Sequence, residues 1–364
     1  MKILFDHQIN TAHNYGGVAR YFYELGRGLI ADFNVNVVYP SMFSNSVFAS
    51  HDFFRSKPFV PNLSFRGKTK IMNYFNERSS KNELNRHFDV FHPTYYDTYF
   101  LNEIGSRPFV ITAYDLIHEK FSDQFGGLSA NEVFFEKRKI LFEKSTQIIA
   151  ISNSTKNDLI DIYKVPSSKI DVVHLANSLE SDNIIYPTDN NYILYVGARR
   201  AYKNFKRFAA AVSPLLLKEK DLKIVCAGGG KFNNEELKFL KNLHVLGQFK
   251  QISINDRLLS GLYSNALFFV FPSLYEGFGI PILEAFSCSC AAILSNTSSL
   301  SEVGGDAALY FDPYNEQDIL RTITKLFYDR PLILKLKQAG LERQKMFSWL
   351  ATVRKHYEIY KKLA

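Results

Sequence analysis

The sequence predicts an α/β protein made of two parallel sheets, each covered by helices. Short apolar runs alternate with stretches of helical periodicity along the whole chain. A polar, turn-rich stretch at residues 178–191 interrupts this pattern once, after which the pattern restarts. The length of 364 residues suits two domains. We therefore expect two doubly wound, Rossmann-like units facing each other across a cleft, with ligands at the carboxyl ends of the strands.

The first unit is assigned to residues 1–178. A helix is expected from Gly17 to about Ala31, after the first strand and a loop. Ser152 is expected to cap a helix that ends at Tyr163, because its hydroxyl can bind a free amide of the first turn. The expected strands are the apolar runs Lys2–Asp6, Asn36–Tyr39, Val90–His92, Phe109–Thr112, Gln147–Ile151 and Asp171–His174.

Residues 179–191 form the expected linker and residues 192–346 the second unit. Long helical periodicity follows the last strand of this unit, in Asn315–Asp329 and Pro331–Met346. Residues 347–364 are set apart because they hold a separate amphipathic segment, Trp349–Leu363. The expected strands are Tyr192–Val196, Lys223–Ala227, His244–Leu246, Leu267–Phe271, Ala291–Leu294 and Ala308–Phe311.

The composition is that of an ordinary soluble protein, with 46% hydrophobic and 22% charged residues. No apolar run approaches the ~20 residues that span a bilayer. Asp6 comes before any signal-type apolar region, so a cytoplasmic location is expected. The three cysteines lie in apolar runs and predict reduced core thiols, without the second Cys/His pair that a zinc site needs.

The net charge of +8 is concentrated in two segments. Residues 54–81 interleave basic and aromatic side chains, and the tail from Lys337 to Ala364 is also basic. One interpretation is peripheral contact with an anionic surface, such as the inner face of the cell membrane; the other is a solvated basic face. Nucleic acid is not favoured, because no motif of a binding module accompanies the charge. The segment Trp349–Leu363 is likewise either a packing helix or a membrane-surface helix.

Several motifs are absent, and their absence narrows the function. The chain has no P-loop, no G-x-G-x-x-G after a strand and no G-x-S-x-G turn, which disfavours nucleotidase, dehydrogenase and serine hydrolase chemistry. No two aspartates stand two positions apart, so the D-x-D metal clamp of one class of sugar transferases is also missing.

The most informative stretch is Phe271–Ala285, which follows an apolar strand and opens a helix. Gly277 and Gly279 let backbone amides approach a ligand closely, and the helix N-terminus favours an anion there. Glu276 lies in the loop and Glu284 lies on the helix, where carboxylates suit hydrogen bonds to sugar or ribose hydroxyls. An ordinary strand–turn–helix with solvent-facing glutamates explains the same spacing.

With Gly-Phe-Gly-Ile-Pro between Glu276 and Glu284, this stretch resembles the E-x7-E motif of the family 4 retaining glycosyltransferases. The similarity continues in Ser299–Pro313, in Tyr195–Phe205 and in the Gly16-Gly17 loop, and it covers essentially the full chain. The resemblance implies the two-Rossmann-domain architecture called GT-B. It also implies that the C-terminal helix crosses back to pack on the N-terminal domain.

The resemblance implies roles for individual residues. Glu284 would hold the ribose hydroxyls of a nucleotide, and Glu276 would bind hydroxyls of the transferred sugar. Arg199 and Lys203 would clamp the diphosphate, whose negative charge grows as it leaves, so no metal is needed. Arg200 is an alternative to Arg199, and the competing explanation of Arg199 and Lys203 is a solvated pair at a helix N-terminus. The other expected donor-site residues, mostly backbone contacts, are Gly16, Gly17, Gly229, Gly277, Phe278, Gly279 and Ile280.

On the acceptor side the sequence departs from the family pattern. Many members carry a His-Asp pair after the fourth N-terminal strand, but here Tyr114 replaces the histidine before Asp115. Either Tyr114 takes over the hydrogen bonds, or His118 reaches in from the loop. His92, at the carboxyl end of its strand, is a further acceptor-side candidate.

The resemblance therefore predicts a metal-independent, retaining glycosyltransferase without a cofactor. The expected donor is a nucleotide-diphosphate sugar, with a GDP-linked mannose-type sugar favoured and a UDP-sugar next. The expected acceptor is a glycan or a lipid-linked glycan in bacterial surface polysaccharide or lipopolysaccharide synthesis. Two alternatives stay open: a sugar-nucleotide epimerase or hydrolase on the same fold, and a non-catalytic partner subunit of a transferase.

Overall fold

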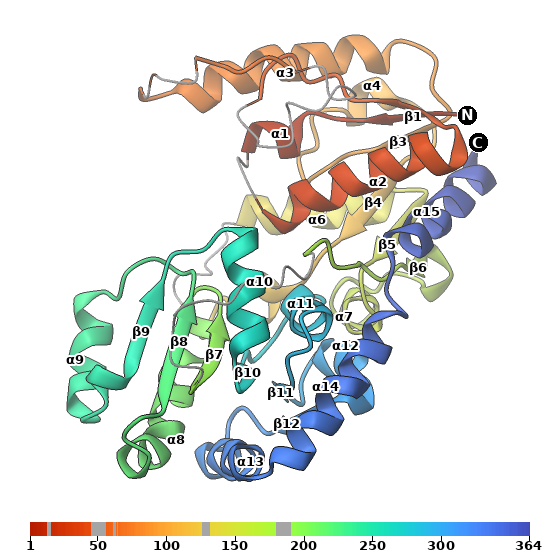
Figure 1. Ribbon diagram of the computed structural model, residues 1–364. Helices are drawn as coiled ribbons and strands as arrows, with labels where there is room; N and C mark the ends of the chain where they lie inside the picture. Colours follow the sequence, from red (N-terminus) through yellow and green to blue (C-terminus); the bar gives the residue numbers. More distant parts are fainter. Residues whose placement is uncertain (13–15, 45–55, 61–62, 64, 126–131, 180–190) are drawn as a thin grey trace.

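The computed structural model describes residues 1–12, 16–44, 56–60, 63, 65–125, 132–179 and 191–364. Two α/β halves lie one above the other, and the chain returns from the second half to the first at its C-terminal end (Figure 1). Residues 180–190 of the predicted linker lie outside the described residues. No helix in the described ranges is both long and apolar enough to cross a bilayer.

The N-terminal half has two parallel three-stranded sheets, in the orders β2-β1-β3 and β4-β5-β6. A bridge between Phe91 and Phe109 joins them, so the expected strands form one continuous layer. Ser152 caps α7 as predicted, accepting a hydrogen bond from the Thr155 amide at 3.0 Å. The elements are β1 (Lys2–Phe5), α1 (Gln8–Ala12), α2 (Gly17–Phe33), β2 (Asn36–Val38), α3 (Lys68–Leu84), β3 (Val90–His92), α4 (Leu101–Ile104), β4 (Val110–Ala113), α5 (Ile117–Phe121), α6 (Glu132–Lys144), β5 (Gln147–Ala150), α7 (Asn153–Tyr163), η3 (Ser167–Lys169) and β6 (Ile170–Val172).

The C-terminal half has one parallel six-stranded sheet, ordered β12-β11-β10-β7-β8-β9. The elements of its sheet layer are β7 (Tyr192–Val196), η4 (Ala201–Lys203), α8 (Phe205–Lys218), β8 (Lys223–Ala227), α9 (Asn234–Asn242), η5 (Leu246–Gln248), β9 (Phe249–Ile252), α10 (Asp256–Asn265), β10 (Phe268–Phe271), α11 (Ile280–Ser287), β11 (Ala292–Ser295), α12 (Leu300–Gly304), η6 (Gly305–Ala307) and β12 (Ala308–Phe311). Three helices follow: α13 (Glu316–Tyr328), α14 (Arg330–Gln344) and α15 (Trp349–Leu363).

One predicted strand in this half is wrong. The expected strand His244–Leu246 is a turn, in which His244 has a positive φ of 57° and Leu246 begins a short 3-10 helix. The strand is β9, which begins three residues after the end of the predicted range and lies at the edge of the sheet. Its central residues Lys250 and Gln251 are polar, and the apolar-run criterion therefore missed it.

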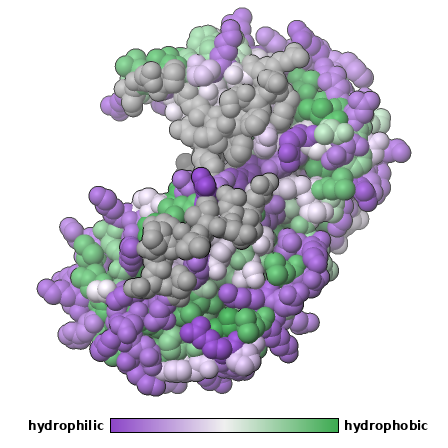
Figure 2. Space-filling view, viewed as in Figure 1, coloured by the Kyte–Doolittle hydropathy of each residue, from purple (hydrophilic) through white to green (hydrophobic). Residues whose placement is uncertain are grey.

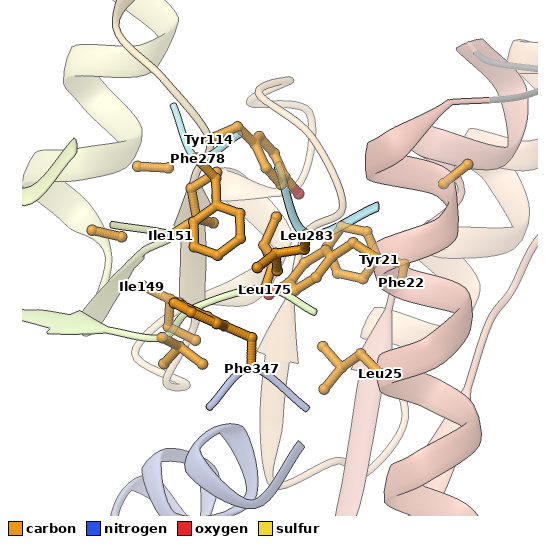
Figure 3. Close-up of a cluster of buried hydrophobic side chains, with 14 of the residues drawn as sticks. Tyr21, Phe22, Leu25, Tyr114, Ile149, Ile151, Leu175, Phe278, Leu283 and Phe347 are labelled. Carbon is orange, nitrogen blue, oxygen red and sulfur yellow. The ribbon is translucent and has the colours of Figure 1, made fainter. Parts of the chain in front are cut away.

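The two halves share a hydrophobic core. Figure 3 shows Tyr21, Phe22 and Leu25 of α2 facing a cluster that includes Phe278 and Leu283 from the C-terminal half. Phe347, which precedes α15, closes one side of this cluster. The interface between the halves is therefore a packed layer over part of its area.

Helix α15 packs against α2 in the N-terminal half, as expected. A side chain at Gly28 would come within 2.7 Å of Val353, so the glycine lets the two helices approach closely. The ring of Tyr357 stacks on Phe33 with centroids 4.6 Å apart. The last helix thus belongs to the core of the half that begins the chain.

Polar side chains continue this contact inside the core. The Nδ1 of His356 lies 2.8 Å from the carbonyl oxygen of Thr352, which can only accept, so Nδ1 carries the proton. The Nε2 atom is then the acceptor for the Tyr21 hydroxyl, 2.6 Å away. Burial lowers the pKa of His356 to about 4, and the ring is neutral at pH 7.

The chain of hydrogen bonds runs on through the sheet. The Tyr21 hydroxyl lies 3.0 Å from that of Thr112, which lies 2.9 Å from Nε2 of His92. The Nδ1 of His92 lies 2.6 Å from the Tyr360 hydroxyl on α15. We call Tyr21, His92, Thr112, His356 and Tyr360 the histidine–tyrosine network, and each of its five side chains has a partner inside it.

Candidate active site

A pocket of about 380 Å³ lies where the two halves meet. The N-terminal half contributes the start of α2 and the residues after β4, and the C-terminal half contributes the turn before α11. Both contributions come from the carboxyl ends of strands, where ligands bind in doubly wound sheets. The lining residues are Gly17, Val18, Tyr21, Tyr114, Asp115, Ile151, Leu175, Lys203, Glu276, Gly277, Phe278, Gly279, Ile280 and Pro281. We call this the interdomain pocket.

An ion pair stands in the interdomain pocket. The Nζ of Lys203 lies 2.6 Å from the Glu276 carboxylate, and both side chains are mostly shielded from solvent. Burial alone would lower the pKa of Lys203, but the Glu276 carboxylate together with Tyr202 and Asp115 outweighs it and the pKa is raised. A fixed ammonium and carboxylate therefore face a cavity large enough for a small molecule.

The turn that carries Glu276 is held from both halves. A side chain at Gly277 would come within 1.9 Å of the Tyr114 carbonyl oxygen, so only glycine lets the two backbones meet there. The hydroxyls of Ser152 and Thr155 on the N-terminal half donate to the Gly277 carbonyl oxygen at 2.7 and 3.3 Å. The geometry of the turn thus depends on the contact between the halves.

Helix α11 starts from this turn. Gly279 precedes its first residue with a φ of 106°, in the left-handed region. The main-chain N–H groups of a helix N-terminus attract an anion, and Lys203 adds a positive charge beside them. The pocket therefore suits an anionic group near the turn.

Glu284 lies one turn further along α11, outside the interdomain pocket. Its carboxyl group accepts a hydrogen bond from the Tyr263 hydroxyl at 3.1 Å. Burial raises the pKa of Glu284 to about 7, although the Tyr263 bond and the charge of Arg20 act in the opposite direction. The Glu284 carboxyl is therefore poised between its two protonation states near neutral pH.

Arg199 does not line the interdomain pocket. Its guanidinium donates to the Glu236 carboxylate at 2.9 Å and to the Gly230 carbonyl oxygen at 2.9 Å. It thereby holds the glycine-rich turn after β8, in which a side chain at Gly229 would come within 2.7 Å of the Gly197 carbonyl oxygen. In this structure Lys203 faces the interdomain pocket without Arg199, and Arg200 is exposed.

The acceptor-side candidates separate into two groups. Tyr114 and Asp115 line the interdomain pocket, whereas His118 lies on α5 with its ring 5.3 Å from that of Phe134. His92 is fully buried in the histidine–tyrosine network, where both of its ring nitrogens have partners. Of the two glycines before α2, Gly17 lines the pocket and Gly16 precedes it as the N-cap residue.

Sequence reasoning missed a second set of contacts between the halves. The Glu302 carboxylate accepts the main-chain N–H of Asn153 at 2.9 Å and lies 2.6 Å from Nε2 of His174. Burial would raise the pKa of Glu302, but these two partners outweigh it and the pKa is lowered. The Tyr275 hydroxyl, next to Glu276, donates to Asp158 at 2.6 Å. No spacing in the sequence indicates these pairs, because each joins residues more than 100 positions apart.

Two family models match nearly the whole chain. The model for "Glycosyltransferase Family 4" matches residues 15–179, and the model for "Glycosyl transferases group 1" matches residues 179–343. The chain belongs to the family 4 glycosyltransferases. The E-x7-E stretch, with Glu276 and Glu284, lies in the segment that the second model matches.

The curated relatives of this glycosyltransferase include enzymes named for O-antigen synthesis. The serotype-specific mannosyltransferase WbdA of Escherichia coli is 28% identical over 262 residues, which cover 67% of this chain and 32% of the relative. The O-antigen chain mannosyltransferase B of Escherichia coli is 30% identical over 218 residues, covering 56% of this chain and 57% of the relative. The chain thus spans from a third to rather more than half of the length of these relatives.

Solved structures confirm the GT-B fold. Sucrose-phosphate synthase from Thermosynechococcus elongatus aligns over 100% of this chain and 98% of its own, with a TM-score of 0.79 and 18% identity. WaaG, a glycosyltransferase involved in lipopolysaccharide biosynthesis, aligns over 99% of both chains with a TM-score of 0.74 and 15% identity. Anabaena HepE in complex with UDP and glucose aligns over 100% of both chains with a TM-score of 0.74 and 13% identity.

Proposed function

We propose that this protein transfers a sugar from a nucleotide-diphosphate sugar to a glycan or lipid-linked glycan during bacterial surface polysaccharide synthesis. The observation that carries the proposal is the Lys203–Glu276 ion pair in the interdomain pocket, beside the N-terminus of α11. The relatives named as O-antigen mannosyltransferases support the same class of reaction.

Each member of the ion pair has a task when the donor binds. The ammonium of Lys203 and the α11 amides stabilise the diphosphate, whose charge rises as the glycosidic bond breaks. Glu276, released from Lys203, accepts hydrogen bonds from hydroxyls of the sugar. The ion pair holds both side chains at the pocket before the donor arrives, and it opens when the diphosphate takes Lys203 and the sugar hydroxyls take Glu276.

We propose that transfer proceeds with retention and without a metal. The two carboxylates that line the interdomain pocket in the described ranges are those of Glu276 and Asp115. With the donor bound, Glu276 accepts hydrogen bonds from the sugar hydroxyls and Asp115 accepts the Ile117 amide at 3.2 Å, and neither is assigned as the base. The oxygen of the leaving diphosphate then takes the proton of the acceptor hydroxyl, on the face from which it departs.

The proposed donor is a mannose-type sugar carried on GDP, with a UDP-sugar as the alternative. The names of the curated relatives support mannose. The neighbouring structure of HepE was solved with UDP and glucose, which supports the alternative. Glu284 is proposed to bind the ribose, which both donors share.

Calorimetric titration with GDP, UDP, ADP and TDP in the presence of a chelator tests the proposal. We expect one nucleotide to bind tightly and Glu284→Ala to weaken its binding. Transfer of the matching sugar, with the anomeric configuration of the product read by NMR, then tests retention. Binding of none of the four nucleotides would favour a non-catalytic partner subunit. Sugar release without acceptor dependence would favour a hydrolase.

We also propose that α3 contacts an anionic membrane surface. Ile71, Tyr74 and Phe75 on this helix are exposed, although they are large and apolar or aromatic. Figure 2 shows hydrophobic surface over the region where α3 begins in Figure 1. Lys70 and Arg78 flank these positions along α3, and the combination of basic and exposed apolar side chains suits acidic lipid headgroups. Part of the basic segment 54–81 lies outside the described residues.

Sedimentation with vesicles measures this contact. The protein is expected to sediment with phosphatidylglycerol vesicles and to stay in solution with phosphatidylcholine alone. Replacing Tyr74 and Phe75 by serine should release it, whereas Leu334→Ser, at an equally exposed apolar site on α14, should not. Equal sedimentation with both vesicle types would contradict the electrostatic part of the proposal.

A further inference from the structure

Each member of the ion pair in the interdomain pocket follows a tyrosine in the sequence. Tyr202 precedes Lys203, and Tyr275 precedes Glu276. The carbonyl oxygen of Tyr202 accepts the main-chain N–H of Leu274 at 2.7 Å, which ties the two segments together. The two segments that carry the ion pair therefore form one unit of the C-terminal half.

Both tyrosines take part in a small hydrophobic cluster that is separate from the two larger cores. Leu274 and Tyr275 are buried in it, together with Ile117 and Phe121 from α5 of the N-terminal half. The ring of Phe121 lies 5.9 Å from that of Tyr275, centroid to centroid, and Tyr202 packs against the same cluster. We call Ile117, Phe121, Leu274 and Tyr275 the α5 cluster. It joins the segments that carry the ion pair to the other half.

The hydroxyl of Tyr275 adds polar contacts to the α5 cluster. It donates to the Asp158 carboxylate on α7 at 2.6 Å and accepts the Leu116 amide at 3.3 Å. The ammonium of Lys120 lies 2.6 Å from the other oxygen of Asp158 and 5.2 Å from the centre of the Tyr275 ring. Burial raises the pKa of Tyr275 and the charge of Asp158 raises it further, so the hydroxyl stays protonated at neutral pH. The residue before Glu276 is thus held by the N-terminal half.

The contacts inside the C-terminal half hold the main chain of Glu276. Its N–H donates to the Ser298 hydroxyl at 3.0 Å, and its carbonyl oxygen accepts the Ser299 hydroxyl at 2.9 Å. The carboxylate itself is held by Lys203, whose ammonium lies 5.2 Å from the centre of the Tyr202 ring. The position of the charged groups therefore depends on the two tyrosines that meet the α5 cluster.

We infer that Tyr275 is a positioning residue, which aligns the Lys203–Glu276 pair through its hydrogen bond to Asp158 in the other half. The inference rests on the proposed function, since it takes this pair as the groups that contact the donor. A misplacement of about 1 Å is enough to lower the rate of a reaction whose groups must be aligned. A small shift of the turn therefore lowers kcat more than it weakens donor binding.

Two substitutions that remove the same kind of bond test the inference. Tyr275→Phe keeps the ring in the α5 cluster and removes the hydroxyl that donates to Asp158. The control is Tyr163→Phe, because the Tyr163 hydroxyl also donates to a carboxylate at 2.6 Å, that of Glu119, but within the N-terminal half. Transfer is measured with GDP-mannose or UDP-glucose, according to which nucleotide binds, and with the membrane fraction of the native host as the acceptor probe.

We expect Tyr275→Phe to lower kcat about 10-fold and to leave the donor KM within about threefold of the native value, as the loss of one hydrogen bond to a charged group predicts. Tyr163→Phe should keep the native kcat. Asp158→Ala removes the same bond from the other half and should lower kcat as much as Tyr275→Phe does, with no further loss in the double variant. An equal loss of kcat in Tyr163→Phe would overturn the inference, and so would independent losses for Tyr275 and Asp158.

A second readout needs no turnover and separates this inference from the proposed function. Acetic anhydride is allowed to react with the native protein and both phenylalanine variants, and mass spectrometry compares the acetylation rate of Lys203 with that of the exposed Lys206. The Lys203 ammonium lines the interdomain pocket, where a small reagent reaches it. Burial lowers the pKa of Lys203, but its neighbours, Glu276 above all, raise it more, so the native protein holds little free amine there.

Tyr275→Phe should raise the relative acetylation rate of Lys203 about threefold or more, because a looser ion pair releases more free amine. Tyr163→Phe should leave this rate unchanged. An unchanged rate in Tyr275→Phe would overturn the inference, whether or not the protein transfers sugar. A raised rate in a protein that transfers no sugar would support the role of Tyr275 in holding the pair and refute the proposed function.

Discussion

Two clusters of buried ionisable side chains differ in how their hydrogen bonds are completed. In the histidine–tyrosine network, His92 and His356 are neutral, and each ring nitrogen has a partner from the protein. In the interdomain pocket, Lys203 and Glu276 are charged and satisfy mainly each other, beside a cavity. Both clusters tie together segments that are distant in the sequence.

The difference separates a structural cluster from a binding one. A network whose donors and acceptors are used within the protein leaves little for a ligand, although its member Tyr21 also lines the interdomain pocket, and a change in it costs stability. A charged pair beside a cavity can exchange partners with a charged or polar ligand, and a change in it costs activity. Stability and turnover therefore respond to different substitutions in this protein.

The largest expected effect tests the binding cluster. Lys203→Ala should lower turnover by about 10²–10³-fold, because it removes the ammonium that stabilises the leaving diphosphate. Steady-state transfer assays measure this change. The matched control is Lys206→Ala, three residues later, where the ammonium is exposed and pairs with Glu235. If Lys203→Ala keeps its turnover within about threefold of the native rate, Lys203 has no part in the proposed mechanism.

The next effect tests the structural cluster. His356→Ala should lower the free energy of unfolding by about 3 kcal/mol, because it leaves a cavity and deprives the Tyr21 hydroxyl of its acceptor. Urea denaturation measures the loss, and nucleotide affinity should stay unchanged. Lys355→Ala, on the exposed side of α15, is the control. Loss of nucleotide binding in a folded His356→Ala protein would end the proposed separation of roles.

Two buried groups, His356 of the histidine–tyrosine network and Glu284 on α11, should make stability respond oppositely to pH. Because burial lowers the pKa of His356 to about 4 from its ordinary 6.5, the unfolded chain takes up this proton first as the pH falls. This histidine therefore makes the protein less stable as the pH falls from 6.5 to about 4. In His356→Ala, the dependence of the free energy of unfolding on pH should lose this contribution.

The smallest effect concerns Glu284, on α11 outside the interdomain pocket. Its pKa is raised from 4.5 to about 7, so the folded protein binds this proton more tightly than the unfolded chain does. Its contribution to stability therefore falls as the pH rises from 4.5 to about 7. We expect Glu284→Gln to be more stable than the native protein at pH 8 by up to about 3 kcal/mol, and equal to it at pH 4. Thermal denaturation at both pH values measures this; a native-like pH slope in the variant would show that another group titrates.

The sequence predicted most of the fold, because strand and helix signals are local. Leu267–Phe271 and Ala308–Phe311 are apolar runs, and the structure has strands there. Ser152 was predicted as a helix cap, which it is. The edge strand Phe249–Ile252 was missed because polar residues interrupt its apolar pattern. An apolar run is therefore a better signal for a buried strand than for a strand at the edge of a sheet.

The site was less predictable, because orientation depends on distant partners. The turn around Gly277 could be read from a local motif, and it does line the interdomain pocket. Arg199 stands at the expected position in its loop, yet Glu236, 37 residues later, turns its guanidinium away from that pocket. His92 ends a strand as expected. Its Nδ1, however, is hydrogen-bonded to the hydroxyl of Tyr360, which comes from a helix 268 residues later. Spacing in the sequence carries no information about such partners.

The place where the last helix begins has a practical consequence. Trp349 is the single tryptophan of the chain, and its indole N–H donates to the Ser178 hydroxyl at 2.8 Å. That hydroxyl in turn donates to Glu24 on α2 at 3.1 Å, so the indole lies where α15, arriving from the C-terminal half, meets the end of the N-terminal half. The protein thus carries one tryptophan fluorophore, at this crossing. Its emission can report, without any label, a change in the packing there.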